Sequence, residues 1–291
     1  MTGSIVILAK QQLFMKRPIL SFLFLFSSVL ITNHSFAQHQ LVKLWQTDSV
    51  FKVPESVLFD AGANILYVSN IDGAPDAKDG MGSIGKLGTD GKIIAVDWVT
   101  GLDAPKGLGL YKNRLYAADI DKVVVIDILK GIIIKKIPIP GAEFLNDITV
   151  NKKGVVFVSD TKTGKIHSIE NDKVSLYAEG YKAPNGLLAS GEDLFVLASG
   201  TMYKNGTTVK TKVADGMENA TDGIEQVKEN EFIVSVWNGI IYYVKSDGSV
   251  QQMLDTRSDK INSADIGFDP KKGIVFVPTF FKNSIVAYQL K

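Results

Sequence analysis

Four oxygen-bearing side chains occupy the same place in four similar phrases of the sequence. The phrases are PESVLF, LNDITV, PNGLLA and TDGIEQ, and their second residues are Glu55, Asn146, Asn185 and Asp222. Calcium binds oxygens from carboxylates, amide carbonyls and water. Two carboxylates balance a divalent cation, so the four side chains predict a metal site, with Ca²⁺ the best match, if the fold gathers them. Taken singly, Asn-Gly or Asp-Gly before a strand is ordinary turn chemistry, but turn chemistry does not require the same position four times.

Two further phrases of this kind add a cation and a small residue. Lys106 is the second residue of PKGLGL, and Ala264 takes the corresponding place in SADIGF. An ammonium group at the centre would repel a metal ion, so two roles are open for Lys106. It forms an ion pair with Glu55 or Asp222, or it binds an anionic group of a substrate. We include it among the predicted substrate-binding residues.

The spacing of the phrases predicts the fold. Each phrase is followed by a short apolar strand, and these strands read LYVSN, LYAAD, VFVSD, LFVLA, FIVSV and VFVPT. Six units of roughly 40 residues, each with room for four strands, are typical of an all-β, six-bladed β-propeller. The last unit runs out of chain before its fourth strand, and LVKLWQ at 41–46 is a candidate that closes the ring. The alternatives, a β-sandwich or two small barrels, would not require so regular a period.

The N-terminal segment has the order of regions found in secretory signal peptides. Lys16 and Arg17 precede an apolar run at 19–32, and the small-x-small sequence SFA follows at 35–37. This order predicts a signal peptide over 1–37, with Met15 as a possible true start, and one propeller domain over 38–291. The mature protein would be periplasmic or extracellular and would contain no membrane span. An uncleaved anchor is the alternative, although the apolar run is short for a span.

Charge and composition narrow the partners and the chemistry. With 32 basic and 31 acidic residues, the formal net charge of +1 gives no reason to expect nucleic acid or an anionic membrane. The absence of cysteine and the presence of only three histidines argue against zinc or copper. His167 falls in an alternating strand away from the expected channel, so a Ser-His-Asp triad is not expected. A small molecule is the expected partner.

Two other features belong to the predicted channel mouth. Trp237, Phe280 and Phe281 follow second strands at the face where the phrases begin, and we predict that they bind substrate as an apolar wall. Rim packing is the alternative role. The first unit is longer than the others because of the segment IDGAPDAKDGMGS at 71–83. Its Asp and Gly content fits a solvated loop, a lid or a weak second cation loop.

The ordered set of site residues resembles a known family. Glu after proline, then Asn-Asp, Pro-Asn-Gly and Asp-Gly are similar to the gluconolactonase family, which includes regucalcin (senescence marker protein) and luciferin-regenerating enzyme-like proteins. The order also resembles the calcium site of diisopropyl-fluorophosphatase. The resemblance implies that the four residues hold the metal and that Asp222 is the general base or nucleophile. The chain departs from the family in PESVLF, in Phe144 where sugar-lactone hydrolases carry arginine, and in Ile148 where glycine is common.

These observations lead to two hypotheses of different classes. The first is a calcium-dependent hydrolase of a lactone or related ester, in which the metal polarises the carbonyl and Asp222 activates water or attacks directly. The second is a non-catalytic periplasmic propeller, a binding or scaffold protein, with a structural metal. Phe144 and Lys106 favour the second hypothesis. Phosphotriester hydrolysis would use the same metal residues and is a third possibility.

Overall fold

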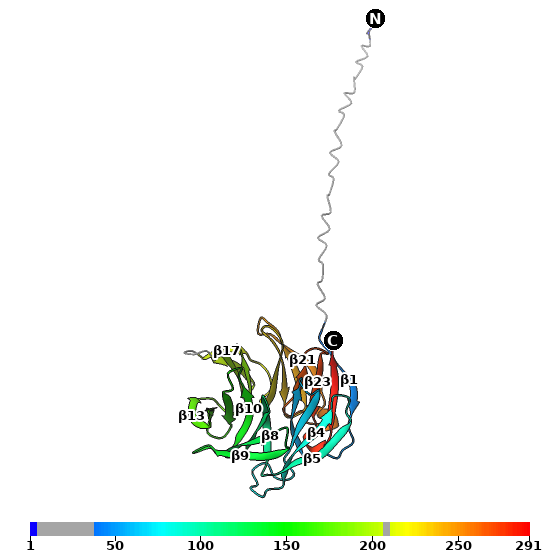
Figure 1. Ribbon diagram of the computed structural model, residues 1–291. Coiled ribbons are helices and arrows are strands. Elements are labelled where there is room, and N and C mark those ends of the chain that lie inside the picture. The colour runs from blue at the N-terminus through cyan, green and yellow to red at the C-terminus, as the bar shows by residue number, and fades with distance from the viewer. Residues whose placement is uncertain (5–37, 206–209) are drawn as a thin grey trace. The chain divides into compact units, whose positions relative to one another are not determined.

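Six antiparallel sheets of four strands make up the fold of the computed structural model, which describes residues 1–4, 38–205 and 210–291 (Figure 1). The prediction of a six-bladed all-β propeller is confirmed. The strands of each blade follow one another outward, and the first strands of neighbouring blades contact one another. Within the described ranges the only helical segments are two short 3-10 turns, η1 (Arg257–Asp259) and η2 (Phe280–Lys282).

The first three blades share this order from the centre outward. Blade 1 contains β2 (Pro54–Asp60), β3 (Ile65–Asn70), β4 (Gly82–Gly88) and β5 (Ile93–Leu102). Blade 2 contains β6 (Pro105–Tyr111), β7 (Arg114–Asp119), β8 (Lys122–Asp127) and β9 (Ile132–Pro138). Blade 3 contains β10 (Leu145–Val150), β11 (Val156–Asp160), β12 (Lys165–Glu170) and β13 (Lys173–Ala178).

The remaining blades follow the same plan, and the last one takes its outer strand from the start of the domain. Blade 4 contains β14 (Pro184–Ser190), β15 (Asp193–Ala198), β16 (Thr201–Asn205) and β17 (Lys210–Ala214). Blade 5 contains β18 (Thr221–Lys228), β19 (Glu231–Val236), β20 (Ile240–Val244) and β21 (Val250–Asp255). Blade 6 contains β22 (Gly267–Asp269), β23 (Ile274–Pro278), β24 (Ile285–Leu290) and β1 (Leu41–Gln46).

The ring closes as the sequence predicts. β1 pairs antiparallel with β24, with Leu41 opposite Leu290 and Gln46 opposite Val286. The pairing joins the two ends of the domain in one sheet and covers the edge that β24 would otherwise expose.

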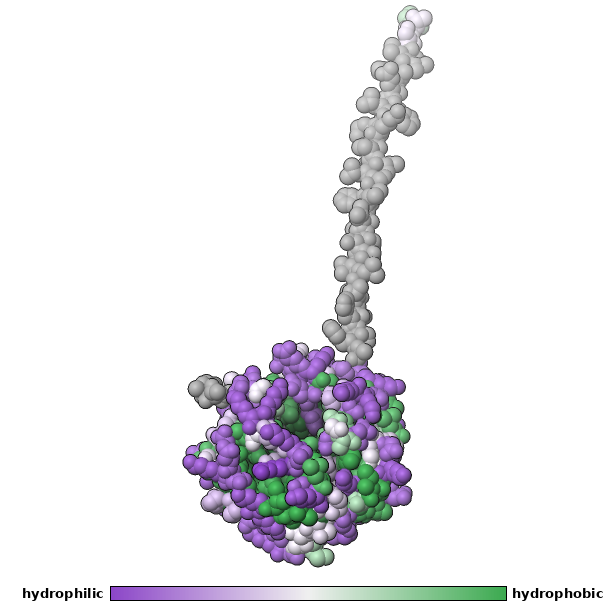
Figure 2. All heavy atoms as spheres, in the orientation of Figure 1, coloured by the Kyte–Doolittle hydropathy of each residue, from purple (hydrophilic) through white to green (hydrophobic). Residues whose placement is uncertain are grey.

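Apolar side chains between adjacent blades form the core. Tyr67 and Ile84 of blade 1 pack with Leu115 and Val124 of blade 2 in one such cluster. The outermost strands are less covered: Figure 2 shows hydrophobic residues in green in the lower part of the view, where Figure 1 labels β5 and β9. Lys135 and Lys136 follow the exposed isoleucines of β9, and lysine on an edge strand discourages pairing with another chain.

The inner strands share an irregularity at their first residues. In blades 1 to 5 the pairing with the second strand shifts register directly around the phrase's second residue, as between Leu145 and Ile148 in β10. β10 begins at Leu145 because the residue before the bulge also pairs, with Asp160 of β11. A β-bulge redirects a side chain locally, so these five blades can aim the residue at the channel.

The predicted signal peptide and the possible start at Met15 lie outside the described residues. Gln38–Lys291 forms one compact unit by its internal contacts. In the part of the chain that the structure describes, no helix is long and apolar enough to cross a membrane.

Candidate metal and substrate site at the channel mouth

Five of the six phrase residues meet at one cavity. The cavity has a volume of about 450 Å³. Its charged and amide side chains come from the second residues of five inner strands, namely Glu55, Lys106, Asn146, Asn185 and Asp222. Ala264 is fully buried among apolar residues and precedes β22, so the sixth blade contributes no polar group of this kind.

Strained backbone precedes three of the four oxygen-bearing residues. Val53, Ala183 and Ala220 have φ angles of 53°, 46° and 65°, and each lies two positions before Glu55, Asn185 or Asp222. Left-handed backbone is uncommon for residues other than glycine, above all for a β-branched one. Such strain persists only where surrounding contacts hold it, and it gathers at functional sites. For Val53, one of these contacts is the 3.0 Å hydrogen bond that its N–H donates to Oδ1 of Asn283.

Serines of the second strands complete the bulges. The hydroxyl of Ser69 accepts the N–H of Ser56 at 2.9 Å, that of Ser159 accepts the N–H of Asp147 at 2.9 Å, and that of Ser235 accepts the N–H of Gly223 at 2.8 Å. These N–H groups directly follow three predicted metal ligands. The sequence analysis missed this role, although the serines recur in LYVSN, VFVSD and FIVSV.

The last residues of three second strands hold the loops that lead into the site. Asp160 accepts the N–H groups of Glu143 and Phe144 at 3.1 and 3.0 Å. Asp119 accepts those of Asp103 and Ala104 at 3.0 and 2.8 Å. In blade 1, Asn70 accepts the N–H of Lys52 at 3.4 Å. The recurring Asn or Asp at the end of these strands was the signal in the sequence.

Hydrogen bonds leave oxygens of the site free for a ligand. Asn185 donates its amide group to Oδ1 of Asp222 at 2.9 Å, and Asn146 donates to the hydroxyl of Thr161 at 3.1 Å. In both asparagines the amide nitrogen makes the hydrogen bond that orients the side chain, so the amide oxygen is not used for it. In the described ranges, Oε2 of Glu55 and Oδ1 of Asn185 are buried and have no hydrogen-bond partner. Unpaired buried oxygens are unfavourable, so a cation or a hydrogen-bond donor would stabilise them.

Electrostatics also favour a cation here. Burial raises the pKa of the Glu55 carboxyl well above its usual value, and repulsion from Asp222 and Asp265 adds to the shift. Burial and repulsion from Asp265 likewise raise the pKa of Asp222, against the hydrogen bond from Asn185. A divalent cation would offset the burial and the repulsion. Because the described residues contain no group of three His, Cys, Asp or Glu side chains suited to a metal, the ligand set would combine two carboxylates with two amides, as calcium accepts.

Lys106 lines the cavity, and its nearest partners are neutral groups. Its Nζ donates to the carbonyl oxygens of Pro75 at 2.8 Å and Ala104 at 2.9 Å, and it lies 4.5 Å from the centroid of the Phe144 ring. Burial lowers the pKa of Lys106 to about 8, although Glu55 and other carboxylates oppose the shift. No ion pair within 4.0 Å joins Lys106 to Glu55 or Asp222.

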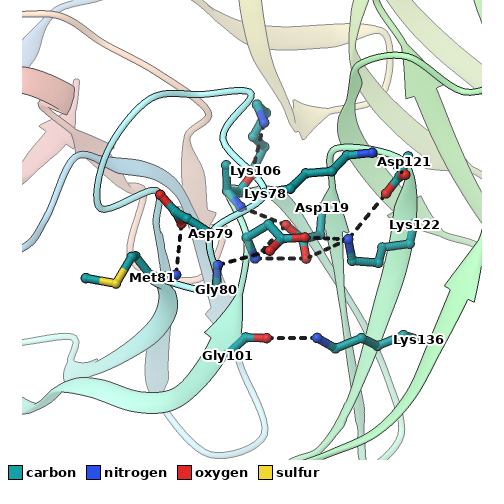
Figure 3. Close-up of polar contacts among 12 residues, drawn as sticks. Lys78, Asp79, Gly80, Met81, Gly101, Lys106, Asp119, Asp121, Lys122 and Lys136 are labelled. Atoms are coloured by element: carbon teal, nitrogen blue, oxygen red, sulfur yellow. Dashed lines mark hydrogen bonds and ion pairs between the residues drawn. The ribbon is translucent and has the colours of Figure 1, made fainter.

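The loop at 71–83 forms part of the cavity wall and is fastened to blade 2. Ile71, Gly73 and Pro75 line the cavity. Lys78 pairs with Asp121 at 2.6 Å, as Figure 3 shows beside Lys106. The N–H of Gly80 also donates to a carboxylate of blade 2, that of Asp103, at 3.1 Å.

The three predicted wall aromatics do line the cavity. The ring centroid of Trp237 lies 5.5 Å from that of Phe280 and 6.0 Å from that of Phe281. The centroids of the two phenylalanine rings lie 4.7 Å apart, and all three pairs are edge-on. Trp237 follows β19, and the phenylalanines begin η2. No histidine lines the cavity within the described ranges. His167 is buried in β12, and His39 stacks on Tyr243.

A second group of carboxylates lines another cavity on the inner strands, with a volume of about 540 Å³. Its members are Asp147, Asp265 and Glu225, each one to three residues beyond a phrase's second residue. Asp147 accepts the N–H groups of Leu187 and Ile148, both at 2.6 Å. Asp265 accepts the hydroxyl of Ser56 at 2.5 Å. The sequence analysis did not consider these acids.

Comparison with known proteins supports the fold. No family profile and no curated protein matches the chain. A streptogramin B lyase structure is similar with a TM-score of 0.62 and 16% identity, over 87% of this chain and 97% of that one. A catalytically inactive virginiamycin B lyase from Staphylococcus aureus with quinupristin has a TM-score of 0.59 and 14% identity, over 87% and 99%. A nidogen/laminin complex has a TM-score of 0.61 and 15% identity, over 74% and 84%. At these identities the likeness shows the propeller fold alone.

Proposed function

We propose that the chain is an exported, metal-dependent hydrolase of a lactone or a related ester, with a calcium-like cation at the channel mouth. One observation carries the proposal. Glu55, Asn146, Asn185 and Asp222 line a single cavity, and Oε2 of Glu55 and Oδ1 of Asn185 are buried there without a hydrogen-bond partner in the part of the chain that the structure describes. The donor set of two carboxylates and two amides fits a hard divalent cation. When bound, such a cation would polarise the carbonyl of the ester.

The residues of the chain supply the remaining chemistry. Asn185 holds Oδ1 of Asp222 by its amide group, which leaves Oδ2 free to take a proton from water or to attack the carbonyl carbon. Thr161 fixes Asn146, because it accepts the amide N–H and donates to the carbonyl of Pro184 at 2.7 Å. A general base of this kind contributes about 10²–10⁴-fold to the rate.

The lining favours a substrate with an apolar part. Four aromatic side chains line the cavity, namely Phe144, Trp237, Phe280 and Phe281. The resemblance to the gluconolactonase family supports the hydrolase and its metal, while Phe144 argues against gluconolactone itself.

Lyase chemistry receives less support. The inactive virginiamycin B lyase carries alanine in place of a histidine, whereas no described histidine lines this cavity. A non-catalytic binding or scaffold propeller with a structural metal remains the second candidate, favoured by the engagement of Lys106 with backbone carbonyls.

Metal analysis followed by an activity screen tests the proposal. Purified protein should retain calcium at about one ion per chain and should hydrolyse aryl-substituted lactones or esters only when calcium is present. Bound calcium without hydrolysis of any lactone, ester or phosphotriester would favour the scaffold. Absence of metal binding would overturn both candidates.

A further inference from the structure

Lys106 is a buried cation whose immediate partners are neutral. The residue is 2% exposed, and its Nζ contacts two backbone carbonyls and the Phe144 ring. An ammonium group has three protons to donate, and within the described ranges only two acceptors are present. No carboxylate oxygen of those ranges lies within 4.0 Å of the nitrogen. Glu55, Asp76 and Asp119 act on this charge only from beyond that distance. A buried charge without a directly paired counter-charge is unfavourable, so an anion from a ligand would complete this environment.

A second cation converges on the same aromatic ring. Nζ of Lys162 lies 5.2 Å from the centroid of the Phe144 ring. The positive charges of Lys162 and Lys106 repel each other. Lys162 is exposed and is not itself a lining residue, but the Phe144 ring beneath it lines the cavity. No described carboxylate forms an ion pair with Lys162. An anion at the edge of the cavity would relieve the repulsion between the two ammonium groups.

The aromatic wall lies across the ring from these lysines. Lys106 belongs to blade 2, and Phe144 and Lys162 belong to blade 3. Trp237 follows a strand of blade 5, and Phe280 and Phe281 follow one of blade 6. In a closed ring of six blades, blades 2 and 3 face blades 5 and 6. The cavity therefore has a cationic side, an apolar side and the oxygen-bearing residues between them.

We propose that the substrate of this site is an amphipathic anion: an ester or lactone that carries a carboxylate or similar group at one end and an apolar ring or chain at the other. Lys106 and Lys162 bind the anionic group, and Trp237, Phe280 and Phe281 pack against the apolar part. The reacting bond then lies beside Asp222. The reaction named here rests on the proposed hydrolase function, but the binding of an amphipathic anion does not.

Calorimetry with a matched pair of probes tests the binding. The probes are 3-phenylpropane-1-sulfonate and the corresponding neutral sulfonamide, because a sulfonate is a weak ligand for calcium. Both are titrated into the mature chain, with calcium and after chelation. We expect the sulfonate to bind at least about tenfold more tightly than the sulfonamide, since a hydrogen bond to a charged group contributes about 1.5–3 kcal/mol. The preference should disappear in Lys106→Met and fall several-fold in Lys162→Met.

Lys86→Met is the matched control. Nζ of Lys86 also lies over an aromatic ring, 4.7 Å from the centroid of Trp98, but Trp98 does not line the cavity, whereas the Phe144 ring beside Lys106 and Lys162 does. This variant should keep the full preference for the sulfonate. Equal affinity of the wild-type protein for both probes would overturn the inference. So would a Lys106→Met variant that weakens both probes equally while Lys162→Met changes neither, because Lys106 would then only support the loop through Pro75.

The same design separates this inference from the proposed function. Sulfonate preference in a protein that hydrolyses nothing would support the anion site and overturn the hydrolase. If hydrolysis occurs, esters with and without a remote carboxylate should differ at least about tenfold in KM, with similar kcat, and Lys162→Met should remove most of that difference. Hydrolysis with no preference for the anionic ester would support the hydrolase and overturn the anion site.

Discussion

Two groups of buried carboxylates lie along the inner strands, and their partners differ. At the channel mouth, Glu55 retains an oxygen without a partner, and Asp222 is held by a single described side chain, Asn185. In the other group, Asp147 accepts two backbone N–H groups, and Asp265 accepts the hydroxyl of Ser56. The bond from Asp147 reaches Leu187, so it joins blade 3 to blade 4. Similar residues at neighbouring positions thus have different surroundings. The first group includes a carboxylate oxygen with no hydrogen-bond partner among the described residues, and the second group connects blades.

The largest expected effect is the loss of turnover in Asp222→Asn. Removal of the base or nucleophile should lower kcat about 10²–10⁴-fold. The free energy of unfolding should stay the same or rise, because a buried carboxylate with a raised pKa becomes a neutral amide. Steady-state kinetics and urea denaturation measure the two quantities. Full activity in this variant would remove Asp222 from the mechanism, and unfolding would place it with the connecting group instead.

Asp147→Ala should show the opposite behaviour. The N–H groups of Ile148 and Leu187 would lose their acceptor, and each buried unsatisfied group costs about 1–3 kcal/mol. We expect the free energy of unfolding to fall by about 3 kcal/mol in a urea titration.

Glu229→Ala, an exposed acid of blade 5, serves as the control and should change stability by less than about 0.5 kcal/mol. Similar stability of the two variants would show that Asp147 does not connect the blades.

The pH dependence of stability tests the second group through Glu225. Burial raises the pKa of Glu225 from 4.5 to about 8, so the folded chain keeps a proton that the unfolded chain releases. The contribution of Glu225 to the free energy of unfolding is therefore greatest below its unfolded pKa of 4.5, and it is lost as pH rises to about 8. Glu225→Gln should make this decline shallower in urea titrations across that range.

Added calcium should affect the carboxylates at the channel mouth and should not affect Glu225. Because Glu55 and Asp222 must lose protons to bind a cation, added calcium should raise the urea midpoint more at pH 8 than at pH 5, in wild type and in Glu225→Gln alike. Parallel pH profiles of the wild type and Glu225→Gln without calcium would contradict the assigned pKa of Glu225.

Sequence reasoning reached the fold and the members of the site for a physical reason. A propeller repeats one unit, so residues at the same position of the repeat lie at equivalent positions around the ring. The four oxygen-bearing residues could therefore be placed near one another without coordinates. The closure by Leu41–Gln46 followed from the strand missing at the other end.

The partners of Lys106 were not predictable in the same way. They are backbone carbonyls of a loop that occurs only in blade 1 and of Ala104, and the repeat carries no information about such a contact. Asp147 was not predicted because it follows Asn146, and only the second residue of each phrase was considered as a site residue. The strain at Val53 depends on φ, which a valine in a sequence does not signal.

The smallest expected effect tests why the mouth tolerates that strain. Ala183 is exposed and has a φ angle of 46°, so Ala183→Gly removes an unfavourable conformation without loss of packing. We expect the free energy of unfolding to rise by up to about 1 kcal/mol, since left-handed backbone costs an L-residue about 1–2 kcal/mol and glycine loses part of this in chain entropy. Ala189→Gly within β14, the strand that follows Ala183, replaces a residue whose φ is not positive and should instead lower stability by about 0.5–1 kcal/mol. If the strained turn also aims Asn185, Ala183→Gly should weaken calcium binding several-fold in a calorimetric titration. Unchanged calcium affinity would mean that this turn only connects blades 3 and 4, as the carboxylate of Asp147 does.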